Sequence, residues 1–151
     1  MDVRELMTPD PVACLPTESC AAAGDIMRRR NCGFVPIVES QSTKRIIGVV
    51  TDRDLLLHLT AVDRAPSHVP VEACMTRAVE FVAPNAGLED AARIMERAAI
   101  HRLPVVEDGR LVGILSLKDI ALAARKQWAY AGPHVAERQM TEIVEAIAAA
   151  R

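Results

Sequence analysis

The chain has 151 residues, of which 50% are hydrophobic and only 3% aromatic, and its formal net charge is −2. It is long enough for one compact domain or two small half-domains around an aliphatic core. The near balance of acidic and basic residues does not favour a nucleic-acid or membrane-surface protein, and no apolar run approaches the roughly 18 residues of a membrane span. The first residues lack the pattern of a signal peptide, so we expect a cytoplasmic protein.

The first elements follow from apolar spacing. A short strand is predicted near Val12–Cys14, and a helix opened by Thr17 as its N-cap follows, with apolar residues at helical spacing and a basic end at 28–30. Two apolar strands come next, Phe34–Val38 and Ile46–Val50, and a second helix starts at about Arg53.

The same order returns in the second half of the chain. A strand is expected near Val79–Val82, then a helix opened by Asn85, then strands Leu103–Val106 and Leu111–Leu115 and a helix from about Lys118. The Asp-Gly pair between these two strands is a strong signal for a tight hairpin.

An internal repeat underlies this order. Met7-Thr8 returns as Met75-Thr76 and Pro36 returns as Pro104, both 68 residues later. Thr51 returns as Ser116, only 65 residues later, because the second hairpin turn is three residues shorter. A length change confined to a turn is expected for two copies of one fold.

We therefore predict an α/β fold of two strand–helix–strand–strand–helix (βαββα) repeats, packed as a pseudo-two-fold pair, with an added C-terminal helix. The repeats span 1–60 and 71–127, a linker spans 61–70, and a helical tail spans 128–151. In the tail, apolar residues from Met140 to Ile147 follow amphipathic spacing. Whether this helix packs within its own subunit or on a second one is left open.

The four cysteines fit the expected compartment. They show no C-x-x-C spacing and no neighbouring histidine, and they are Cys14, Cys20, Cys32 and Cys74. We expect small buried or half-buried thiols, with a redox or metal site as the alternative. The scattered histidines include no H-x-x-x-H pair, so no metal site is predicted.

Each copy carries a hydroxyl and a carboxylate where a strand meets a helix: Thr51 with Asp54, and Ser116 with Asp119. This spacing is close to a capping box, which satisfies free N–H groups at a helix start. The capping box prefers Glu or Gln at the fourth position, and a shorter Asp also suits the paired hydroxyls of a ribose. Both interpretations stand at this point.

The repeat resembles a tandem pair of cystathionine-β-synthase (CBS) domains of the stand-alone bacterial type, over about residues 1–125. The resemblance rests on the motifs at 3–8, 33–38 and 48–54 in the first copy and at 74–76, 101–106 and 113–119 in the second. It implies a regulatory module, not an enzyme, that binds AMP, ADP or ATP between its two copies, and that forms disc-shaped dimers in many members. No cofactor is implied.

The resemblance also implies the ligand-binding residues. Ribose and phosphate would be held by the hydroxyl and the acid of each motif, the basic neighbours would add charge, and residues around the two prolines would shape the adenine pocket: Thr51, Arg53, Asp54, Ser116, Lys118, Asp119, His101, Arg102, Val35, Pro36, Leu103 and Pro104. The first copy has Gly33-Phe34 in place of His101-Arg102. Because it lacks these basic residues, the two copies are not expected to form equal nucleotide sites.

We thus expect a nucleotide-binding sensor of energy state or stress that passes its signal to an effector protein as a homodimer, without membrane or nucleic-acid partners. The alternative is a protein-interaction or oligomerisation module that binds no nucleotide. No Ser/His/Asp set or paired carboxylate with an identifiable motif indicates catalysis.

Overall fold

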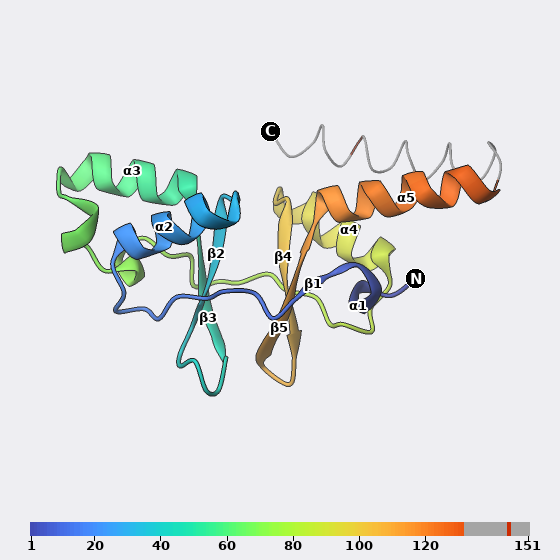
Figure 1. Cartoon of the computed structure of the whole chain (residues 1–151), viewed down its shortest axis with the longest axis horizontal. Coiled ribbons are helices and arrows are strands. Elements are labelled where there is room, and N and C mark those ends of the chain that lie inside the picture. Colours follow the sequence, from blue (N-terminus) through green and yellow to red (C-terminus); the bar gives the residue numbers. More distant parts are fainter. Residues whose placement is uncertain (132–144, 146–151) are drawn as a thin grey trace. The chain divides into compact units, whose positions relative to one another are not determined.

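The computed structural model describes residues 1–131 and residue 145, and side chains through residue 126 within the first range. Its elements are α1 (Val3–Leu6), β1 (Thr8–Pro9), α2 (Cys20–Arg30), β2 (Phe34–Val38), β3 (Ile46–Thr51), α3 (Asp52–Val62), η1 (Pro66–His68), η2 (Val71–Ala73), α4 (Leu88–Ala98), β4 (Arg102–Glu107), β5 (Arg110–Ser116) and α5 (Leu117–Ala131) (Figure 1). The order α2-β2-β3-α3 recurs as α4-β4-β5-α5, which confirms the predicted repeat. The amphipathic segment from Met140 to Ile147 lies outside the described residues.

The predicted opening strands are single parallel bridges instead. Cys14 pairs with Ile37, and Val82 pairs with Val105. In a parallel ladder the next hydrogen bond would come from the residue two positions on, which is Pro16 in the first copy and Pro84 in the second. Proline has no N–H to donate, so the ladder stops after one residue.

The predicted N-caps Thr17 and Asn85 are wrong by two residues. The caps are Ser19, whose side chain accepts a hydrogen bond from the Ala22 N–H at 3.1 Å, and Gly87. The segments just before them are held extended by another part of the chain, because carbonyls at 16 and 18 accept N–H groups from 72 and 71, and carbonyls at 84 and 86 accept those of 4 and 3. Each helix therefore begins just beyond the extended segment whose carbonyls are bound in this way.

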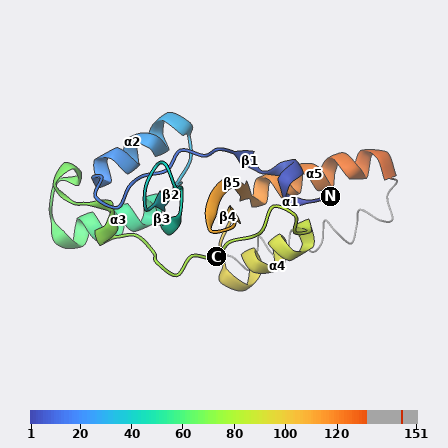
Figure 2. The same cartoon turned by 90° about the horizontal axis from the view of Figure 1, so that it is seen from below.

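The chain folds into two units, each built around one hairpin (Figures 1 and 2). We call them the repeat-1 unit (residues 11–79 and 108–111) and the repeat-2 unit (residues 1–10, 80–107 and 112 onward). In the repeat-1 unit β2 pairs antiparallel with β3, and α2 and α3 contact these strands and each other. In the repeat-2 unit the strand order is β1-β5-β4, and α5 contacts both α1 and α4.

The opening segment of each repeat belongs to the other repeat's unit. The first ten residues pack with the second hairpin, where Thr8 pairs with Ile114 and Val3 is fully buried. Sixty-eight residues later, Thr76 pairs with Val49 of the first hairpin and Val71 is fully buried there. The domain boundaries at residues 60 and 70 stay predictions, but the contacts divide the chain into units that are not continuous in sequence. The expected linker 61–70 also contains structure, because α3 runs to Val62 and Val69 is buried.

The opening segments, each packed on the hairpin of the other repeat, explain why the motifs at 48–54 and 113–119 both begin with glycine. A Cβ on Gly113 would lie 2.5 Å from the Met7 sulfur and 3.1 Å from the Thr8 carbonyl oxygen. A Cβ on Gly48 would lie 2.7 Å from the Met75 sulfur and 3.1 Å from the carbonyl oxygen of the next residue. Only glycine lets the backbones approach this closely.

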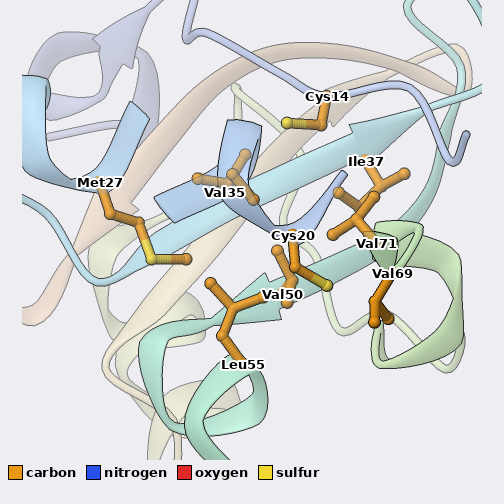
Figure 3. Close-up of a cluster of buried hydrophobic side chains, with 10 residues drawn as sticks. Cys14, Cys20, Met27, Val35, Ile37, Val50, Leu55, Val69 and Val71 are labelled. Carbon is orange, nitrogen blue, oxygen red and sulfur yellow. The ribbon is translucent and has the colours of Figure 1, made fainter. Parts of the chain in front are cut away.

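Both cores are aliphatic, as composition predicted. Figure 3 shows the repeat-1 core, where Val35 and Ile37 from β2 meet Val50, Leu55 and Val71. The repeat-2 core places Leu103, Val105 and Leu115 against Met95 in the same way. The second hairpin turns on Asp108-Gly109 with φ of 51° and 79°, the positive angles that a tight two-residue hairpin needs. No helix in the described part of the chain is long and apolar enough to cross a membrane.

Candidate functional site

The repeat-1 corner, residues 51–54, joins β3 to α3 through a complete capping box. The Asp54 N–H donates to the Thr51 hydroxyl at 3.1 Å, and the Thr51 N–H donates to Asp54 Oδ2 at 2.9 Å. The hydroxyl and the acid thus satisfy two N–H groups that a helix start would leave free.

The repeat-2 corner, residues 116–119, has the same arrangement at the start of α5. The Asp119 N–H donates to the Ser116 hydroxyl at 3.2 Å, and Asp119 Oδ2 accepts from the Ser116 N–H at 2.9 Å and from its hydroxyl at 2.6 Å. The capping interpretation of both motifs is therefore confirmed as local structure.

The cap leaves part of each carboxylate available. Every hydrogen bond that the two carboxylates accept goes to Oδ2, and within the described part of the chain Oδ1 of Asp54 and Oδ1 of Asp119 accept no hydrogen bond. Both side chains are half-buried, so neither is sealed in its core. A carboxylate oxygen has two lone pairs, so a ligand hydroxyl could bind Oδ1 while the helix cap stays formed.

The two corners differ in the first turn of the helix. In both, the first helical N–H donates to the start of the preceding hairpin: Asp52 to the Gly33 carbonyl at 3.1 Å, and Leu117 to the His101 carbonyl at 2.9 Å. At the second position the Arg53 N–H donates to the Asp52 side chain at 2.9 Å. The Lys118 N–H has no hydrogen bond within the described residues, so only the repeat-2 corner offers an open amide to an anion.

Asp52 is a residue that the motif analysis missed, because it stands at a variable position of the motif. Its carboxylate lies over Gly33, where a Cβ would come within 2.5 Å of Oδ2. Gly33 and Asp52 are therefore linked: the missing side chain at 33 makes room for a negative charge. The difference between the copies could have been found in the sequence, because His101 and Leu117 stand in the second copy at the positions equivalent to Gly33 and Asp52.

The repeat-2 corner gathers positive charge. His101 is exposed just before β4, Arg102 is half-buried as the first residue of β4, and Lys118 is exposed at the second position of α5. None of the three forms an ion pair within the described part of the chain. In the repeat-1 corner Arg53 stands between two aspartates, which offset its charge.

The four residues expected to shape an adenine pocket are core residues. Val35 and Leu103 are fully buried, each in its own hydrophobic cluster, and Pro36 and Pro104 are fully buried beside them. The proline carbonyls accept the N–H groups of Cys14 and Val82 at 3.0 and 3.1 Å. These side chains hold the strands in place, and their contact with a base stays a prediction.

The cysteines are thiols, as expected, with Cys14 and Cys20 buried and Cys32 and Cys74 half-buried. Burial, together with the Glu18 charge, raises the pKa of the Cys14 thiol to about 11. No group of three or more His, Cys, Asp or Glu residues suited to a metal ion occurs among the described residues.

Two βαββα units, each with a capped corner at the strand-to-helix junction, define a class of paired α/β repeat modules. The CBS domain model matches residues 3–61 and 71–126, and the chain belongs to the CBS domain family. It is 36% identical over 120 residues to the CBS domain-containing protein YhcV of Bacillus subtilis, a match that covers 80% of this chain and 83% of YhcV.

Solved structures share the fold. The crystal structure of CBSX2 in complex with AMP has a TM-score of 0.71 and 29% identity, covering 83% of this chain and 97% of CBSX2. The CBS domain pair of protein MJ0100, in complex with 5-methylthioadenosine and S-adenosyl-L-methionine, has a TM-score of 0.74 and 25% identity, covering 84% and 98%. Both structures hold adenosyl ligands.

Proposed function

We propose that this chain is a regulatory module, not an enzyme, that binds an adenosine nucleotide at its strand-to-helix corners and signals cellular energy state or stress to a partner protein in the cytoplasm. The observation that carries the proposal is the spare Oδ1 of each capping aspartate, beside a half-buried hydroxyl, in a fold whose solved relatives hold AMP, methylthioadenosine and S-adenosylmethionine. A carboxylate oxygen that the cap does not use is suited to a ribose hydroxyl.

We place the phosphate at the repeat-2 corner. The open Lys118 N–H and the charges of Arg102 and Lys118 favour an anion there, and the His101 imidazole can donate a hydrogen bond beside them. In the repeat-1 corner the Asp52 carboxylate takes the equivalent N–H and adds negative charge, which disfavours a phosphate. One phosphorylated ligand per chain is the expected result, with its charged end at α5.

Calorimetry with AMP, ADP and ATP tests the proposal. Wild type should bind at least one of the three, and Asp119→Asn should weaken binding about 10- to 100-fold, because a hydrogen bond to a charged group is worth about 1.5–3 kcal/mol. The Asn side chain can still accept the Ser116 N–H, so the fold should survive. Absence of both heat and thermal stabilisation with all three nucleotides at millimolar concentration would overturn the proposal.

A second pair of variants tests the phosphate assignment. Lys118→Ala should weaken AMP binding and leave adenosine binding unchanged, since adenosine has no phosphate. Arg53→Ala is the matched control in the other corner and should change neither. If Arg53→Ala weakens AMP binding and Lys118→Ala does not, the phosphate belongs to the repeat-1 corner.

A second candidate function, protein interaction, is supported by exposed apolar side chains on the second helix of each repeat. Leu56 and Leu57 of α3 are 66% and 56% exposed, and Leu122 of α5, the counterpart of Leu57, is 46% exposed. We propose that these helices meet a second copy of the chain. Light scattering of Leu57→Glu beside wild type should show a shift from dimer to monomer; a wild-type monomer would contradict this.

A further inference from the structure

The repeat-1 unit holds two cysteine sulfurs close together that no part of the nucleotide proposal uses. Cys20 is the first residue of α2, and Cys74 caps the short helix η2, 54 residues later in the chain. Their Sγ atoms lie 3.7 Å apart, the only close pair among the four thiols of the described chain. A disulfide bond is about 2.05 Å long, so closing it requires the sulfurs to approach by about 1.7 Å.

The backbone holds both residues in this position. The Cys20 N–H donates to the Val69 carbonyl at 2.8 Å, and Ser19 forms an antiparallel β-bridge with Pro70. On the other side, the Cys74 N–H donates to the Val71 carbonyl at 3.1 Å. Cys20, Val69 and Val71 belong to the buried cluster of Figure 3, and Cys74 packs against its edge. Side-chain rotation can therefore close the pair without separating the two segments.

We propose that Cys20 and Cys74 are a redox modification site that forms an intrachain disulfide when the protein meets a peroxide. Cys74 is half-buried and reacts first, while Cys20, only 1% exposed, is the resolving thiol. The Cys74 thiolate attacks one peroxide oxygen, the O–O bond breaks, and a sulfenic acid and hydroxide form. Cys20 sulfur then attacks Cys74 sulfur, the S–O bond breaks, and water leaves. The two thiols and one hydrogen peroxide give one disulfide and two waters.

The environment of Cys74 makes this reaction slow. Burial, helped by the neighbouring Cys20 thiol and the charge of Asp54, raises the pKa of Cys74 to about 12. Because the thiolate is the reacting form, only sustained exposure to peroxide oxidises the site at neutral pH.

The bond would tie α2 to the crossing segment 69–76, which we call the strap. The strap lies across β3, where Thr76 exchanges hydrogen bonds with Val49 at 3.0 and 2.8 Å, and β3 ends at Thr51. An oxidised chain therefore has the strap locked on the strand that leads into the repeat-1 corner. Reduction by a cellular thiol reverses the change by thiol–disulfide exchange.

Peptide mapping tests the site directly. Folded protein is treated with hydrogen peroxide, blocked with iodoacetamide and cleaved with trypsin and Glu-C, which isolates each cysteine in its own peptide. Peptides 19–28 and 73–77 contain Cys20 and Cys74 alone. We expect them as one cross-linked species, lighter than their sum by two hydrogen atoms and separated by dithiothreitol. Oxidation of Cys74 to sulfinic acid without a cross-link, or a cross-link through Cys14 or Cys32, would overturn the proposal.

Thermal unfolding provides the second measurement. The oxidised protein should melt on the order of 10 °C above the reduced one, because the bond closes a long loop in the unfolded chain. Cys74→Ser should remove both the cross-link and the peroxide-dependent shift. Cys32→Ala, at the other half-buried thiol, is the matched control and should retain both. A peroxide-dependent shift that persists in Cys74→Ser would contradict the assignment.

Discussion

The exchange of opening segments between the two repeats makes a sharp steric prediction at Gly113. In Gly113→Ala the new methyl carbon would meet the Met7 sulfur at 2.5 Å, the Met7 Cγ at 3.0 Å and the Thr8 carbonyl oxygen at 3.1 Å. Ordinary carbon contacts start at about 3.5 Å. Met7 is half-buried and can rotate away, but Thr8 is held by its pairing with Ile114. The strand β1 must therefore shift by a few tenths of an ångström.

Overpacking of this kind costs about 1–3 kcal/mol, and we expect about 2 kcal/mol for Gly113→Ala. For a chain of this length that corresponds to a melting temperature lowered by about 4–8 °C. Gly48→Ala should behave alike but more mildly, because its closest contact, the Met75 sulfur, lies at 2.7 Å. Urea denaturation followed by circular dichroism measures both.

Two further variants identify the cause. Gly24→Ala lies in the interior of α2, where a Cβ would meet nothing within 4 Å, and should stabilise the protein by about 0.5–1 kcal/mol. Adding Met7→Ala to Gly113→Ala removes the two shortest contacts, so the double variant should lose less than the two single losses together. If Gly113→Ala is as stable as Gly24→Ala, or if the two losses at Met7 and Gly113 simply add, the crossing of β1 over Gly113 is refuted.

The remaining predictions concern the caps and the buried thiol. Thr51→Ala should cost about 1 kcal/mol in urea denaturation while Thr51→Ser costs much less, because serine keeps the oxygen that accepts the Asp54 N–H; equal losses would contradict the cap. The pKa of Cys14 is raised from 9.0 to about 11 in the folded chain, so between these values the unfolded state releases its proton first and the free energy of unfolding falls as pH rises. Cys14→Ala should make that fall less steep across the same pH window, and Cys74, whose pKa is raised to about 12, should cause part of the remainder; an unchanged slope would show that Cys14 does not contribute.

The repeat itself could be predicted from the sequence because each copy carries its own local signals. Apolar runs on either side of a turn located the two hairpins, helical apolar spacing located the helices beside them, and Asp108-Gly109 fixed the second turn. These signals involve residues close together in the chain. The exchange of opening segments could not be predicted, because Val3 and Val71 stand in equivalent places whether each packs on its own repeat or on the other.

The same long-range contacts explain the misplaced helix starts. Thr17 and Ser19 are both good N-cap residues, so composition could not choose between them. The choice is made by Val71, whose N–H binds the Glu18 carbonyl at 2.7 Å and holds this stretch extended. That contact joins residues 53 positions apart and leaves no local pattern.

The corners show why a motif alone could not separate capping from ligand binding. Both functions need a hydroxyl and an acid at a helix start, so the same two residues satisfy either one. The geometry removes the conflict between them, because each cap uses only Oδ2 of its aspartate and leaves Oδ1 for a ligand. What separates the two corners is a pair of residues at variable positions: Asp52 occupies space that Gly33 leaves empty and takes the next helix N–H, whereas Leu117 leaves that N–H open beside His101. We therefore propose that the duplicated scaffold keeps the sugar-binding acid in both copies and concentrates the phosphate-binding charge in one.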